Sequence, residues 1–194
     1  MNSSEKKFKL IDFSFKMIED YGWQSFSLKK LSESQEIPFE EVTKILKSKE
    51  SLLREFTQMI DIKVEKDFDY INSEDTSIKD NLFELIMLRL DYMQSYKKAL
   101  KSIINTFKSD PLVAKSVTEN VMNSLDFYLE LTNAYNDSFF DIFKKKSIFI
   151  IYGYVFSIWL EDNSVELSKT MSELDKVLTF SEKLALNFKS YTPF

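Results

Sequence analysis

"SQEIPFEEVTKILKSKESLL", residues 34–53, indicates a turn, a short helix and the start of a longer helix. Pro38 suits the first turn of the short helix, because its missing N–H costs nothing there. Val42 and Leu46 give that helix an inward side, and Ser48 is placed to cap the longer helix. The segment therefore predicts two helices joined at a tight angle, preceded by a turn on which a helix-turn-helix can be built.

The residues before this stretch predict two more helices. A first amphipathic helix is indicated by inward residues at spacings of three and four: Ile11, Ser14, Phe15 and Ile18. Gly22 ends this helix, and Ser27 can cap a short second one. Three short helices within the first 50 residues then make one compact N-terminal unit.

The residues after it predict about six longer helices. The last is expected to begin near Asn163, which forms a capping-box pattern with Glu166 three residues later. The run "KKK", 144–146, is interpreted as the solvated start of a helix. The fold class is therefore all-α with about nine helices. We expect a helix-turn-helix domain at 1–50 and a helical ligand-binding and dimerisation domain at 51–194.

The composition excludes several kinds of chemistry. The chain has two glycines and three prolines, which favours helices over a turn-rich β protein. It has no cysteine and no histidine, so no thiolate nucleophile, Cys/His zinc site or Ser-His-Asp triad is possible. We therefore predict no metal, no cofactor and no enzymatic activity.

The N-terminus and the most apolar segment predict a cytoplasmic protein. Charges interrupt the first residues too often for a signal peptide. The most apolar run, 148–160, would span roughly 20 Å as a helix, against about 30 Å of bilayer hydrocarbon. A buried or interface helix is the better interpretation, and no transmembrane segment is predicted.

The formal net charge of −5 is unevenly distributed. Residues 1–50 contain nine lysines and nine acidic residues, so the excess of acid lies in the rest of the chain. A neutral N-terminal part is weak ground for nucleic-acid binding, which usually depends on a basic face.

The N-terminal wording nevertheless resembles that of the TetR family of one-component transcriptional regulators. Residues 36–53 align without a gap on the family's usual "GVSKGTLYHHFPSKEALL", with "SKE" retained at 48–50. Upstream, "LIDFSFKMIEDYGWQSFSLKKLS", 10–32, resembles the family's "ILDAALELFAEKGYDATSMRDIA". The resemblance implies a ligand-responsive regulator, expected to be a repressor, that binds double-stranded DNA as a homodimer.

The resemblance also implies which residues meet DNA. These are Ser27, Lys29, Lys30, Pro38, Phe39, Glu41, Thr43, Lys44, Lys47 and Lys49. Lys49 is the strongest phosphate candidate, because it opens a helix whose first amides can also face a phosphate. Phe39 can contact either a thymine methyl group or a partner protein, and solvated helix surface is the competing interpretation of the lysines.

The chain departs from the family pattern in its reading helix. Phe39, Glu40 and Glu41 stand where the family often has Lys-Gly-Thr, and two glutamates repel DNA phosphate. Glutamate can, however, accept a hydrogen bond from cytosine N4. Glu36 stands where glycine is common, so either it takes a positive φ at a cost of about 1–2 kcal/mol or the turn differs.

The body of the chain, at 88–103, 109–117 and 158–178, also resembles TetR-like proteins, including the lipid-binding ubiquinone-biosynthesis proteins of that fold. A cavity for a small apolar ligand is implied, lined by Met87, Tyr92, Phe107, Phe127, Tyr128, Phe149 and Tyr152, although each of these also suits a core. The expected dimer interface is Gly153, Phe156, Trp159, Leu167, Met171, Leu174 and Leu178. The alternative function is a TetR-fold protein that has lost DNA binding and binds a lipid, an isoprenoid or a partner enzyme.

Overall fold

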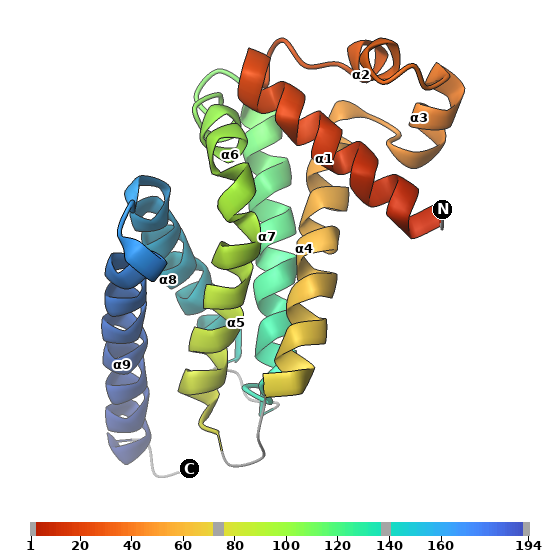
Figure 1. Ribbon diagram of the computed structural model, residues 1–194. Coiled ribbons are helices and arrows are strands. Elements are labelled where there is room, and N and C mark those ends of the chain that lie inside the picture. Colours follow the sequence, from red (N-terminus) through yellow and green to blue (C-terminus); the bar gives the residue numbers. More distant parts are fainter. Residues whose placement is uncertain (1–2, 72–75, 137–140, 192–194) are drawn as a thin grey trace. The chain divides into compact units, whose positions relative to one another are not determined.

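The computed structural model describes residues 3–71, 76–136 and 141–191 (Figure 1). The helices in order are α1 (Ser3–Tyr21), α2 (Leu28–Ser34), α3 (Phe39–Ile45), α4 (Lys49–Ile71), α5 (Ile78–Met93), α6 (Lys97–Ile104), α7 (Pro111–Leu131), α8 (Asp141–Glu161) and α9 (Ser168–Tyr191). Short 3₁₀ turns, η1 (Gln94–Tyr96) and η2 (Val165–Leu167), precede α6 and α9. All regular structure in these ranges is helical, which confirms the all-α prediction.

The chain divides into two compact units. The first contains residues 1–63 and 92–124, and the second contains residues 64–91 and 125–194. The predicted boundary near residue 50 between a DNA-binding and a ligand-binding domain stays a prediction.

An aromatic cluster holds the first unit together. Phe15 of α1 stacks on Phe56 of α4 with ring centroids 4.0 Å apart, and Tyr96 of η1 meets both rings edge-on at 5.3 and 5.0 Å. The Tyr96 hydroxyl donates a 2.6 Å hydrogen bond to the Asp12 carboxylate. Aromatic pairs in these geometries contribute about 0.5–1.5 kcal/mol each beyond the area they bury. The cluster therefore ties α1 to α4 and to the segment before α6.

Local hydrogen bonds shape the connection from α2 to α3. The Ser27 hydroxyl accepts from the Lys30 amide at 3.2 Å, which confirms its predicted role as the cap of α2. Ser32 donates its hydroxyl proton to the Ile37 carbonyl at 2.6 Å, and the Ile37 amide donates back to the Ser32 carbonyl at 3.1 Å. Pro38 directly precedes α3, and its carbonyl accepts hydrogen bonds from the amides of Glu41 and Val42 in the first turn of that helix. Hydrogen bonds therefore stabilise both the start and the end of the turn, which contains no glycine.

A buried arginine joins three helices of the second unit. Arg89 of α5 is 2% exposed. Its Nε donates to the hydroxyl of Tyr152 on α8 at 3.1 Å, and its Nη1 donates to the hydroxyl of Tyr128 on α7 at 3.2 Å. The guanidinium also lies 5.8–5.9 Å from both ring centroids. The fork-shaped donor set of arginine suits this bridging role, which one ammonium group does not reproduce.

Asp162 organises the connection between α8 and α9. Its Oδ1 accepts from the amide and hydroxyl of Ser164 at 2.9 and 2.6 Å, and its Oδ2 accepts from the amide and hydroxyl of Thr170 at 2.8 and 2.6 Å. Burial of this carboxyl by itself favours the neutral form, but the four hydrogen bonds outweigh it and hold the pKa of Asp162 well below its usual range. Asp162 thereby supplies the acceptor for the first turn of α9.

The predicted start of the last helix was therefore wrong. Glu166 and Leu167 both have φ of 54°, a left-handed conformation that is incompatible with the expected capping box at Asn163 and Glu166. The α-helix begins instead at Ser168. The hydrogen bonds that the Asp162 carboxylate accepts from Thr170, eight residues later, stabilise a helix start at Ser168 in place of the one that the Asn163–Glu166 pattern predicts.

None of the described helices has both the length and the apolar composition that crossing a bilayer requires.

Replacing Asp162 by Ala is expected to destabilise the α8–α9 hairpin by about 3 kcal/mol at pH 7, because hydrogen bonds to a charged group contribute about 1.5–3 kcal/mol each and part of the loss is recovered by water. The folded-state pKa lies below the ordinary value of about 3.9. The stabilisation is thus fully present above that value and is lost as the pH falls through the folded-state pKa.

Urea unfolding of both proteins at pH 7 and at pH 3.5, with hydrogen exchange of the Thr170 amide, measures this effect. The difference between the two proteins should narrow at the lower pH. The control is Glu182→Gln, which alters an exposed residue on α9. Equal unfolding midpoints for Asp162→Ala and the parent at pH 7 would contradict the assigned role.

Candidate nucleic-acid interface

The outer side of α3 is exposed, as a reading helix requires. Val42 is fully buried, at 0% exposure, and fixes the inward direction. Glu40 and Lys44, which lie about opposite Val42 at 100° per residue, are both exposed. Glu41 is exposed and Thr43 half-buried on the two flanks, and the Thr43 hydroxyl donates to carbonyls of its own helix. The outward surface of α3 is therefore polar and carries two acids and one lysine.

The remaining predicted DNA contacts lie around α3 in the same unit. Phe39 is 50% exposed, and Pro38, Lys29, Lys30 and Lys47 are also exposed. The Lys30 ammonium donates to the Ser25 carbonyl at 2.8 Å, and Lys29 lies 4.0 Å from Glu33. Surface pairs of this kind are weak and are easily exchanged for a phosphate. Ser27 is half-buried, with its hydroxyl used in the helix cap.

Lys49, the strongest predicted phosphate contact, is half-buried and is engaged within its own chain. Its ammonium group donates to the Trp23 carbonyl and lies 4.4 Å from the centroid of the Trp23 ring. Burial lowers the pKa of Lys49. The first turn of α4 is instead closed by Ser48 and Ser51, which exchange amide-to-hydroxyl hydrogen bonds of 3.0 and 3.1 Å. Lys49 therefore links the start of α4 to Trp23 in the segment after α1, within the first unit.

The turn between α2 and α3 contains a backbone conformation that usually selects glycine. Glu36 has φ of 53°, so the first of the two alternatives stated for this position is the one observed. An L-residue in this region costs about 1–2 kcal/mol. The two hydrogen bonds between Ser32 and Ile37 enclose Glu36 and hold it there.

The residues predicted to line a ligand cavity are divided between the two units. Tyr92 and Phe107 belong to the first, and the second contains Met87, Phe127, Tyr128, Phe149 and Tyr152. Of these, Tyr128 and Tyr152 are brought together around Arg89. Arg89 was not among the predicted site residues, although an arginine inside the apolar run 85–90 is a recognisable signal.

Two surface hollows of about 320 Å³ each lie elsewhere. One is lined by Asp12, Phe15, Lys16, Glu19, Ser95 and Tyr96, and the other by Tyr135, Asp141, Ile142 and Lys145. The residues predicted for the ligand cavity line neither hollow.

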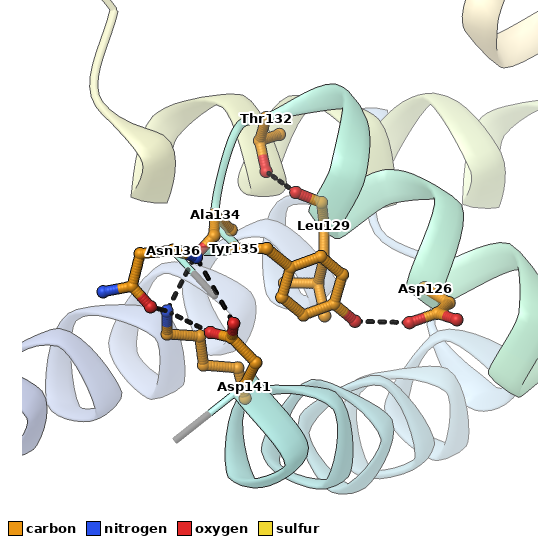
Figure 2. Close-up of polar contacts among 8 residues, drawn as sticks. Asp126, Leu129, Thr132, Ala134, Tyr135, Asn136 and Asp141 are labelled. Atoms are coloured by element: carbon orange, nitrogen blue, oxygen red, sulfur yellow. Dashed lines mark hydrogen bonds and ion pairs between the residues drawn. The ribbon is translucent and has the colours of Figure 1, made fainter. Parts of the chain in front are cut away.

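The second hollow lies where the segment after α7 meets the start of α8 (Figure 2). Figure 2 shows the Tyr135 hydroxyl pointing at Asp126, to which it donates a hydrogen bond. Lys145 pairs with the same carboxylate. Lys144 donates to the Ala134 carbonyl at 2.8 Å and to Asp141 at 2.7 Å. The expectation of a solvated lysine run was therefore wrong for Lys144 and Lys145, which fasten α8 to the preceding segment.

Four residues of the predicted dimer interface are buried inside their own chain. Trp159, Leu167, Leu174 and Leu178 are at most 6% exposed, so these side chains offer no surface to a second subunit. α8 and α9 pack against each other, and the apolar stripe of α9 at Leu174 and Leu178 lies within the chain. Gly153 is exposed, Phe156 is half-buried, and Met171 is 39% exposed.

A different set of apolar residues is exposed on this hairpin. The hairpin face consists of Phe143, Ile150 and Tyr154 on α8, with Phe180 and Leu184 on α9, at exposures of 42–70%. Within each helix these residues share one flank at 100° per residue. Tyr154 donates to Glu173, which lies on the same flank of α9, at 3.0 Å. The two flanks therefore adjoin and form one apolar strip bordered by Gly153.

Comparison with known proteins identifies the fold. No family model and no curated protein sequence matches the chain. The TetR transcriptional regulator from Nitrosomonas europaea ATCC 19718 is similar in structure, with a TM-score of 0.72 and 16% identity over 91% of this chain and 97% of that one. A putative transcriptional regulator from Pseudomonas aeruginosa PAO1 gives 0.61 and 12% over 94% and 93%. A putative TetR-family regulator from Mesorhizobium loti MAFF303099 gives 0.58 and 14% over 92% and 96%. The chain has the TetR-like fold.

Replacing Glu36 by Gly is expected to stabilise the protein by about 0.5–1 kcal/mol. Relief of the left-handed strain is about 1–2 kcal/mol, and the extra flexibility of glycine in the unfolded chain offsets roughly half of it. Urea unfolding followed by circular dichroism measures the difference. The matched control, Glu33→Gly on α2, places glycine in a helix and should cost about 1 kcal/mol. A lower midpoint for Glu36→Gly would refute the strain.

Proposed function

We propose that this protein is a ligand-responsive regulator of transcription that binds double-stranded DNA as a homodimer and acts as a repressor in the cytoplasm. The observation that carries the proposal is the exposed outer side of α3, in a chain whose fold matches solved transcriptional regulators. A short helix that presents polar side chains outward from a helix-turn-helix is suited to the major groove. The protein would catalyse no reaction.

In the proposed complex, α3 lies in the major groove and lysines meet the phosphates on either side. Lys29 and Lys30 of α2 and Lys47 after α3 are exposed, and Lys29 and Lys30 would exchange their contacts with Glu33 and the Ser25 carbonyl for a phosphate. Lys44 reaches outward from α3 itself. These four lysines compensate Glu33, Glu36, Glu40 and Glu41, so binding would rest on a few well-placed contacts and would be salt-sensitive.

We propose that the second subunit docks on the hairpin face. Five exposed apolar side chains along one strip are an interaction surface rather than an ordinary solvated one. A Cβ built on Gly153 meets nothing within 4 Å in the single chain, so the helix of a partner can approach closely there. A two-fold dimer that reads two half-sites requires its two copies of α3 to lie about one DNA turn, roughly 34–36 Å, apart.

The proposed effector is a small apolar ligand bound among the aromatic and methionine side chains of the helical body. Its binding would change the separation of the two reading helices, so that operator affinity falls. To shift a two-state equilibrium from mostly bound to mostly released, an effector must favour the released form by several kcal/mol. The Arg89 bridge between Tyr128 and Tyr152 is one element that such a ligand would have to rearrange or contact.

A second candidate function is a TetR-fold protein that binds a lipid, an isoprenoid or a partner enzyme in place of DNA. The inward position of Lys49 and the acidic character of α3 favour it. This candidate predicts that the purified protein carries an apolar ligand in native mass spectrometry and shifts no DNA.

Gel-shift titration with DNA from upstream of the protein's own gene tests the first candidate. Each lysine that meets a phosphate contributes about −0.9 to the slope of log affinity against log salt. Lys47→Ala, present twice in a dimer, should therefore reduce the magnitude of the slope by about two. Lys66→Ala, an exposed change on α4, should leave it unaltered. A failure to shift any such fragment at low salt would exclude DNA binding.

Replacing Gly153 by Leu tests the pairing mode. In a single chain the position is open, so leucine should stabilise α8 by up to about 1 kcal/mol through helix propensity. If a partner helix crosses there, the same change should convert the dimer to monomer in sedimentation velocity. Ile150→Glu is expected to do likewise, whereas Ile78→Glu, exposed on α5, should not. A Gly153→Leu dimer of parental affinity would rule out the hairpin face.

A further inference from the structure

Two oppositely charged residues occupy the most outward positions of α3. Glu40 and Lys44 lie four residues apart, on the side away from buried Val42, and both are exposed. They are separated by about 6 Å along the helix axis, at 1.5 Å per residue. That separation is between one and two steps of a base-pair stack. The pair therefore presents one acceptor and one donor to neighbouring base pairs.

Glu40 and Lys44 lie farthest from the buried side of α3, whereas Glu41 and Thr43 lie on its flanks and Phe39 lies nearer to Val42. The Thr43 hydroxyl already donates to the carbonyls of Phe39 and Glu40, at 3.1 and 3.2 Å. Thr43 thus has its proton engaged within the helix and offers mainly its methyl group. Phe39 is half exposed and apolar, so it too suits a methyl group rather than a polar edge.

The major-groove edges of the bases differ in the donors that they offer to a carboxylate and in the acceptors that they offer to an ammonium group. Cytosine presents the N4 amino donor, and guanine presents the O6 and N7 acceptors. Thymine presents an acceptor and a methyl group, and adenine presents a donor beside an acceptor. A carboxylate therefore matches cytosine best, because the groove edge of cytosine itself carries only the N4 donor, whereas adenine presents the N7 acceptor beside its N6 donor.

We infer that Glu40 selects cytosine and Lys44 selects guanine in base pairs one or two steps apart in each half-site, an inference that rests on the proposed function. The selectivity comes from exclusion as much as attraction. A carboxylate pressed against an edge without a donor loses water and gains no partner, which is strongly unfavourable. The acidic reading helix, which weakens binding to phosphate in general, becomes the means of rejecting sites that lack this cytosine.

The test begins with selection of binding sites by the purified full-length protein from a randomised duplex library. Each cytosine of the selected site is then replaced in turn by N4-methylcytosine, and affinity is measured by fluorescence anisotropy. The methyl group occupies the position of the amino hydrogen that faces the groove, while base pairing is retained. At one cytosine per half-site we expect a loss of about 5- to 100-fold.

Glu40→Ala identifies the side chain responsible. In this variant the methylated and unmethylated sites should bind within about twofold of each other, and a repeated selection should no longer require the cytosine. Glu50→Ala removes the same charge from an exposed position on α4 and should keep the full methylation effect. Circular dichroism of each variant confirms that the helical content is retained.

The outcomes separate this inference from the proposed function. A selected site whose binding tolerates N4-methylation at every cytosine would overturn the inference while leaving DNA binding intact. A methylation effect that persists in Glu40→Ala would overturn it too. Enrichment of no sequence, with no binding at low salt, would overturn both.

Discussion

The complete burial of Val42 and Leu46 determines which side of α3 faces outward. A helix of seven residues without a side-chain cap is not stable by itself, so its existence depends on this packing. The neighbouring turn is held by the two hydrogen bonds between Ser32 and Ile37, which keep Glu36 in its strained conformation. Once these contacts are made, the outward positions follow from helix geometry alone. The side chains that α3 exposes for binding are therefore determined by the burial of Val42 and Leu46.

Much of the fold was predictable because its signals are local. The cap at Ser27, the helix end at Gly22 and the apolar spacing before α4 each act within a few residues, and these elements lie where they were expected. The start of α9 was not predictable in this way. There, Asp162 forms its bonds across eight residues, and the plausible local pattern at Asn163 lost to it. Local propensity is a reliable guide only where no distant group offers a stronger bond.

The candidate site was predictable in part for the same reason. Periodicity identified which side of α3 is exposed, but the partners of a long side chain are a tertiary property. The sequence pattern therefore did not predict that Lys49 contacts the Trp23 ring or that Lys144 donates to the Ala134 carbonyl. The apolar stripe of α9 is ambiguous in a related way. The stripe predicts that Leu174 packs against another helix, but it does not tell whether that helix belongs to the same chain or to a second subunit. Here it does, and the exposed strip lies on another flank.

The distribution of the two tryptophans gives each compact unit its own optical reporter. Trp23 lies in the first unit, is 2% exposed and contacts the Lys49 ammonium group. Trp159 lies in the second unit and is fully buried, and its ring centroid is 5.1 Å from that of Phe156. An ammonium group close to an indole ring alters its emission, so the two residues should differ spectrally. Intrinsic fluorescence can therefore separate events at the helix-turn-helix from events in the helical body without any added label.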